Sequence, residues 1–113
     1  MKTSYKFGHV DNLCDSVTYV DSNVAFKNVF ETECGGVSLL ALKKGQVLDT
    51  HTTPFEVMVC VCEGEIEFTM IDTAHNIKAG EFLLMGANVA HSVKANADSK
   101  VMLVKVKGPE TNV

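Results

Sequence analysis

From residue 24 to the C-terminus, apolar residues occur in short runs that are separated by glycine, asparagine or aspartate turns. The longest unbroken run, 57–62, is too short for a membrane span or a typical helix. Its valines and the turn residues that follow it predict a strand buried on both faces. The segment 65–71 alternates instead, with Ile66, Phe68 and Met70 on one side and glutamate or threonine on the other. This alternation predicts a strand with one face in water.

The remaining apolar runs are equally short, and no convincing helical period occurs after residue 24. Short strands and turns at such regular spacing predict an all-β sandwich or barrel. Residues 1–22 are polar without a sustained period, so we expect them to form an N-terminal arm. The further strands that we expect are 24–30, closed by a turn at 35–36, then 37–42, 47–48 leading into the His51 segment, 77–78 after a polar hairpin loop at 72–76, 82–85, 89–94 and 100–107.

Composition and charge exclude several classes of protein. At 113 residues, with 46% hydrophobic and 21% charged residues, the chain has the composition of one globular domain covering 1–113. The formal net charge is −4, and all ten basic residues are lysines that form no long block. We therefore expect no nucleic-acid partner. No apolar run is long enough to span a membrane, so we also expect no membrane partner.

The cysteines bear on the cellular compartment. Cys14, Cys34, Cys60 and Cys62 form neither a Cys-x-x-Cys pair nor the dense framework of a small secreted protein. The N-terminal residues lack the apolar core of a signal peptide. We therefore expect a cytoplasmic protein with four free thiols and no disulfide.

Several of the expected strands are apolar on both faces. In the run 57–62, three valines share one face, while Met58 and two cysteines occupy the other. The runs 82–85 and 101–104 show the same two-sided pattern. Contiguous exposed apolar patches are rare on soluble monomers and usually mark an interface. We therefore expect a homodimer that pairs through a sheet face.

Two spacings along the chain resemble the motifs of the cupin family. Gly45, His51 and Gly64 match the first motif, which reads Gly, five residues, His-x-His, three or four residues, Glu, six residues, Gly. Thr53 stands at the second histidine position of this motif, and Val57 stands at the glutamate position.

The second cupin motif reads Gly, five residues, Pro-x-Gly, two residues, His, three residues, Asn. Gly80 and His91 match it, while Gly86, Asn88 and Ala95 replace its other residues. From about residue 37 to residue 107, the chain thus resembles a small single-domain cupin. The resemblance implies a double-stranded β-helix, which is a jelly-roll barrel.

The resemblance also implies a metal site inside the barrel. In cupins the histidines and the glutamate of the two motifs hold a divalent metal such as iron, manganese, nickel or zinc. His51 and His91 carry over as metal ligands, but a threonine hydroxyl at 53 is a poor ligand and Val57 is none.

Two imidazoles fall short of the three protein ligands of a catalytic zinc site. Glu56 would supply a carboxylate, yet strand alternation turns it away from the His51 face unless a bulge precedes it. We therefore expect the metal to be weakly bound or absent, with Glu56 outside the ligand set.

Two functions fit these residues. The first is a cupin that binds a small organic molecule in the barrel, beside a degenerate metal site. The alternative is a metal-dependent oxygenase or isomerase with His51, His91 and Glu56 as ligands. A metal-independent acid–base enzyme that uses one of the two histidines is a third reading. The residues that we expect to line the ligand pocket are His51, Thr53, Val57, Val59, His91 and Val93.

Overall fold

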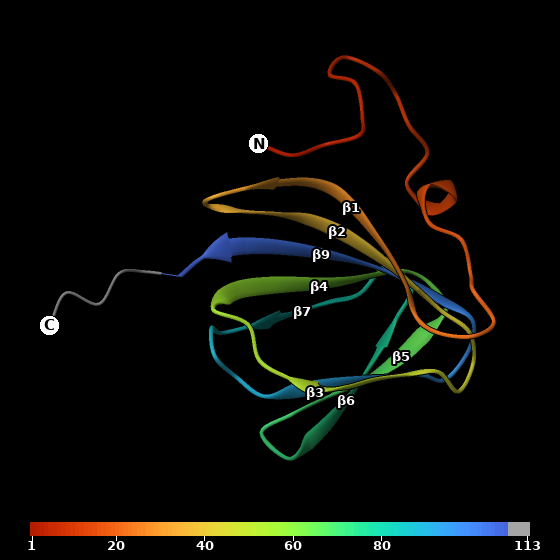
Figure 1. Ribbon diagram of the computed structural model, residues 1–113. Helices are drawn as coiled ribbons and strands as arrows, with labels where there is room; N and C mark the ends of the chain where they lie inside the picture. Colours follow the sequence, from red (N-terminus) through yellow and green to blue (C-terminus); the bar gives the residue numbers. More distant parts are fainter. Residues whose placement is uncertain (109–113) are drawn as a thin grey trace, which may run out of the picture.

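The computed structural model describes residues 1–108, in which nine strands form two antiparallel sheets. The two sheets face each other and enclose the core between them (Figure 1). Within the described residues, no helix is long and apolar enough to cross a membrane. The five-stranded sheet has the order β1 (Ala25–Thr32), β2 (Gly35–Leu42), β9 (Ser99–Lys107), β4 (Phe55–Glu63) and β7 (Phe82–Met85). The four-stranded sheet has the order β3 (Val47–His51), β8 (His91–Ala95), β5 (Glu65–Met70) and β6 (Thr73–Lys78).

The alternation expected in the run 57–62 is confirmed in β4. Val57, Val59 and Val61 are buried in the core between the sheets. Met58 and the two cysteines of this strand are only partly buried, because they lie on the outer face of the five-stranded sheet. The expected all-β barrel is likewise confirmed, since strands lie opposite one another in two sheets and share one apolar interior.

Two expected boundaries were wrong. The segment 72–76 is not a loop, because the chain turns at Ile71 and Asp72, whose φ angles are 50° and 57°, and β6 resumes at Thr73. Positive φ at both central residues is the geometry of a tight two-residue hairpin. The usual sequence signal of that hairpin, a glycine or asparagine, is missing here. The residues 35–36 are not a turn either, since β2 begins at Gly35.

The N-terminal segment lies outside the five-stranded sheet (Figure 1). Its Val17 packs with Leu39 and Ala41 on the outer face of β2, forming a small second core. The hydroxyl of Tyr19 donates a hydrogen bond of 2.5 Å to the carboxylate of Glu63. Burial, together with this carboxylate, raises the pKa of Tyr19. The arm therefore covers the β2 side of this face.

Candidate ligand pocket

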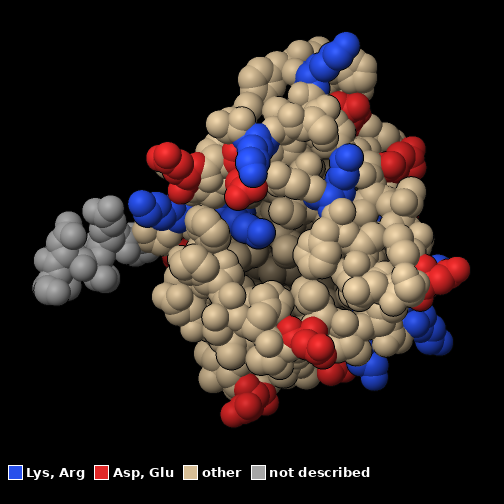
Figure 2. Space-filling view, in the orientation of Figure 1, with Lys and Arg blue, Asp and Glu red and all other residues tan. Residues whose placement is uncertain are grey.

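A cavity of about 250 Å³ lies between the two sheets. Most of its wall is apolar, with side chains from β1, β2, β4 and β9 on one side and from β3, β5 and β8 on the other. Figure 2 shows a hollow near the centre of the face in view, with lysine side chains above it. The polar side chains of the wall are His51, Thr52, Thr53, His91 and Lys105.

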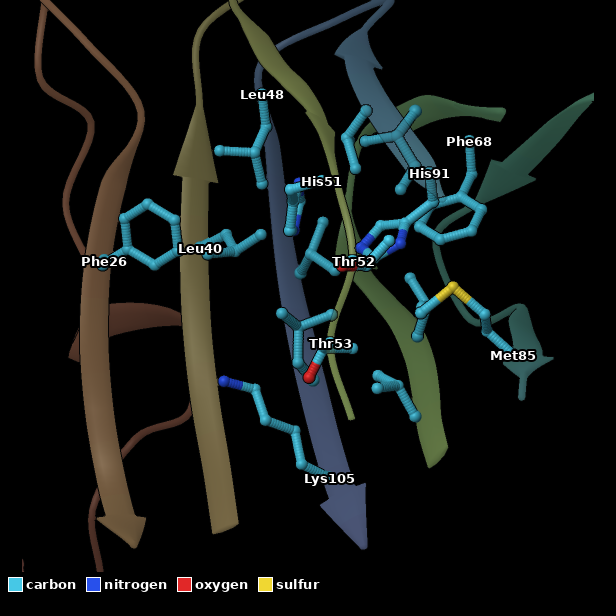
Figure 3. Close-up of a pocket in the computed structure, with 16 residues that line it drawn as sticks. Phe26, Leu40, Leu48, His51, Thr52, Thr53, Phe68, Met85, His91 and Lys105 are labelled. Atoms are coloured by element: carbon cyan, nitrogen blue, oxygen red, sulfur yellow. The ribbon is translucent and has the colours of Figure 1, made fainter. Parts of the chain in front are cut away.

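Strand pairing brings the two histidines together. His51 ends β3 and His91 begins β8, and the two residues are direct partners in the antiparallel ladder. Their ring centroids lie 4.1 Å apart, with the ring planes tilted by 59° (Figure 3). The ring of Phe68, from β5, is stacked against that of His91 at a centroid distance of 5.5 Å. A fully buried phenyl ring therefore supports one side of the histidine pair.

Backbone carbonyl groups fix the orientation of both imidazoles. The Nδ1 atom of His51 lies 2.8 Å from the carbonyl oxygen of Asp49, and the Nδ1 atom of His91 lies 2.8 Å from that of Val89. A carbonyl oxygen can only accept a hydrogen bond, so each Nδ1 carries the proton and donates it. The Nε2 atom of each neutral ring is thereby left as the acceptor.

The electrostatic surroundings keep His91 neutral. Burial lowers the pKa of His91 below its usual 6.5, and the neighbouring His51 lowers it further, while the hydrogen bond to Val89 opposes the change. Burial dominates because the imidazolium form loses more hydration than the neutral ring does. At neutral pH the His91 ring therefore offers the cavity an unprotonated Nε2.

The other residues that we expected in the ligand pocket or the metal site lie in two places. Thr53, Val57, Val59 and Val93 line the cavity together with the histidines. Glu56 is exposed and does not belong to the cavity wall. Strand alternation explains the difference, because Val57 points into the core and its neighbour in β4 points out.

The side chains present do not complete a metal site. Among the described residues, no three histidine, cysteine, aspartate or glutamate side chains are close enough to hold a metal ion together. From the described part of the chain, the cavity wall receives two imidazoles and no carboxylate. A resident transition metal would therefore lack at least one of the protein ligands that such sites usually have.

Sequence reasoning missed several residues of the wall, and Lys105 is the one with a charge. Lys105 lies two residues beyond Leu103 and four beyond Val101 in β9, and all three line the cavity. The period of two along the strand could have revealed it. Phe68 and Met85, which belong to two of the expected strands, also form part of the wall.

The comparisons with known proteins agree with this architecture. A model of the cupin domain matches residues 38–107. A conserved protein of unknown function from Streptococcus pyogenes has a similar structure, with a TM-score of 0.85 and 24% identity, over 98% of either chain. An RmlC-like cupin from Desulfovibrio desulfuricans is 27% identical, with a TM-score of 0.79 over 88% of this chain and 96% of that one. KdgF from Halomonas sp. is 17% identical, with a TM-score of 0.71 over 82% and 88% of the two chains.

The fold and the paired motif histidines define a small β-barrel protein with an internal pocket. Because the family model covers more than half of the sequence, the chain belongs to the cupin family. No curated protein matches the chain significantly. The structural relatives below 25% identity share the fold, and the pocket must be interpreted from its own residues.

Proposed function

We propose that this cupin binds a small organic molecule in the cavity and does so without a resident metal. The observation that carries the proposal is the composition of the cavity wall, which combines an apolar surface with two fixed imidazoles and, among the described residues, has no carboxylate. Ligand pockets are typically concave and mainly apolar, with a few polar groups that orient the ligand. A volume of about 250 Å³ suits a molecule of roughly the size of a substituted benzene ring.

A metal-dependent oxygenase or isomerase is the second candidate. The observation in its favour is the orientation of the two histidines, since each donates from Nδ1 to a backbone carbonyl and leaves Nε2 free. Histidines that bind metals are commonly held in this way. Their third ligand would have to be Glu56, which is exposed and outside the cavity wall.

Metal analysis separates the two candidates. We expect protein purified without a polyhistidine tag, after growth with added iron, manganese, nickel and zinc, to contain far less than one metal ion per chain. The reason is the missing third ligand. The measurement is elemental analysis of the wild type beside the variants His51→Ala and His91→Ala. A near-stoichiometric metal that either variant loses would overturn the proposal and establish the metal-dependent candidate.

We also propose that two copies of the chain pair through the uncovered part of the five-stranded sheet. Its outer face carries an apolar patch formed by Met58, Phe82, Leu84, Val104 and Val106, which we call the sheet patch. Leu84 is 66% exposed and Phe82 is 61% exposed. Leu84 and Val104 both pair with Met58, so the patch is continuous across three strands. A twofold axis would place this apolar surface against its own copy.

The variant Leu84→Glu tests the dimer. We expect the wild type to show twice the mass of a single chain by light scattering after size exclusion at micromolar concentration. Leu84→Glu should shift the protein to a monomer, because it would bury a carboxylate in an apolar interface. Because the Leu84 side chain is highly exposed in the single chain, the fold itself should tolerate the change. The control is Ala74→Glu, an exposed position in β6 on the other sheet. A monomeric wild type would refute the dimer.

A further inference from the structure

Lys105 brings a positive charge into the wall of the apolar cavity. It lies in β9 between two neighbouring strands, where it pairs with Gly36 of β2 and Val57 of β4. Figure 3 shows its side chain on the same side of β9 as the rest of the pocket, below Thr53 and Leu40 in this view. Lys105 as a whole residue is partly buried.

Among residues 1–108, no carboxylate pairs with this charge. The part of the cavity wall that these residues form contains neither aspartate nor glutamate. Within the described part of the chain, Lys105 makes no ion pair and no side-chain hydrogen bond, unlike Lys43, which pairs with Asp21. Glu31 borders an adjoining groove that also reaches Lys105, yet the two form no ion pair. An ammonium group that borders an apolar cavity and has no carboxylate partner favours a negatively charged ligand.

The charge available suits a monoanion. A lysine is a compact point charge, and the chain contains no arginine that could form a bidentate pair with a phosphate. A phosphate monoester carries a charge of about −1.5 to −2 at pH 7, whereas a carboxylate carries one negative charge. The apolar side chains of the cavity wall, such as Leu40 and Leu103, match a hydrocarbon or aromatic body.

We propose that the cavity binds a small monocarboxylate, whose anionic head pairs with Nζ of Lys105 and whose apolar body lies between the two sheets. The inference rests on the proposed function, because it names the class of molecule that the same pocket takes. The two imidazoles lie across the cavity from Lys105, on β3 and β8, and accept a hydrogen bond from a hydroxyl group on the ligand through Nε2. A hydroxyl-bearing carboxylate therefore satisfies both polar regions of the pocket.

Three probes of matched shape test the charge preference on the wild-type protein. Benzoate carries the proposed head group, benzamide is its neutral counterpart, and phenyl phosphate carries the larger charge. Binding is followed by NMR titration at fixed ionic strength, with the signals of Phe68, Met85 and His91 reporting on the cavity. We expect benzoate to bind about tenfold more tightly than benzamide, as a charge-assisted hydrogen bond would give. We expect phenyl phosphate to bind more weakly than benzoate.

A pair of lysine variants assigns the preference to one side chain. Lys105→Met keeps the aliphatic stem and removes the charge, so the affinity for benzoate should fall about tenfold while that for benzamide stays the same. Lys94→Met makes the same change of net charge at an exposed position of β8 outside the cavity wall. This control should leave both affinities unchanged. Thermal unfolding of each variant verifies that the fold is retained.

The outcomes distinguish the carboxylate proposal from the proposed function. Equal binding of benzoate and benzamide in the cavity would overturn the carboxylate proposal and leave small-molecule binding standing. Tighter binding of phenyl phosphate would likewise replace the monocarboxylate with a dianion. A preference for benzoate that survives Lys105→Met would remove Lys105 from the proposal. If neither benzoate nor benzamide perturbs the cavity signals, both proposals fail. Because the comparison of probes uses the wild type, the test does not depend on the folding of a variant.

Discussion

The variant Phe68→Ala is expected to lower the free energy of unfolding by about 4 kcal/mol. Phe68 is 2% exposed and belongs to the main core between the sheets. Its removal deletes buried apolar surface and leaves a cavity that the surrounding strands can only partly fill. It also deletes the ring that is stacked against His91, so the histidine pair loses its support on one side. The measurement is urea unfolding followed by circular dichroism, at one protein concentration because a dimer would make stability concentration-dependent.

Two control variants separate burial from residue type. Phe7→Ala removes a phenyl group that is 83% exposed, and we expect a change within about 0.5 kcal/mol. Phe68→Leu keeps most of the buried volume and should cost no more than about 1.5 kcal/mol. A loss below about 1 kcal/mol for Phe68→Ala would show that the position is not the packed core site that its burial indicates.

The variant Gly64→Ala is expected to cost about 3 kcal/mol, from two separate causes. The φ angle of Gly64 is +81°, in the left-handed region that costs a residue with a Cβ atom about 1–2 kcal/mol. In addition, a Cβ atom at Gly64 would lie 2.2 Å from the carbonyl oxygen of Asp98 and 2.4 Å from Oγ of Ser99. Ser99 is fully buried and its hydroxyl group is hydrogen-bonded to the backbone of Glu65, so this neighbour cannot easily move away. Overpacking of this kind adds about 1–3 kcal/mol.

The matched control is Gly80→Ala. Gly80 has a similar φ angle, +87°, but a Cβ atom there would have nothing within 4 Å. It should therefore cost only the backbone part, about 1 kcal/mol. Both losses are measured by the same urea unfolding experiment. Equal losses for the two variants would mean that the Asp98–Ser99 turn moves aside at no cost, and the steric argument would be wrong.

The contrast between these two glycines shows what the motif spacing can predict about a turn and what it cannot. Gly64 is the closing glycine of the first cupin motif, and Gly80 is the opening glycine of the second. The spacing identifies both as turn residues, and both do have positive φ. Only the approach of Asp98 and Ser99, more than thirty residues away along the chain, distinguishes a crowded turn from an open one.

The sequence likewise predicted only part of the candidate site. Strand alternation put Val57 and Val59 on one face, and the motif register of His51 correctly assigned that face to the interior. The contact between His51 and His91 was suggested only by the family resemblance. It depends on the pairing of β3 with β8, which are separated by forty residues of sequence. Local periodicity contains no information about which distant strands become neighbours.

The amino-acid sequence by itself determined the all-β class, the shared face of the valines in β4 and the alternating pattern of β5. These features follow from local rules, because each strand must match its apolar residues to the face that is buried. Tertiary structure alone decided that Lys105 has no charged partner among the described residues and that the sheet patch stays uncovered by the N-terminal arm. It also decided that Ile71 and Asp72 form a tight hairpin. The physical reason is that burial and charge at these positions depend on the order and register of strands that are distant in the chain, where β9 inserts between β2 and β4.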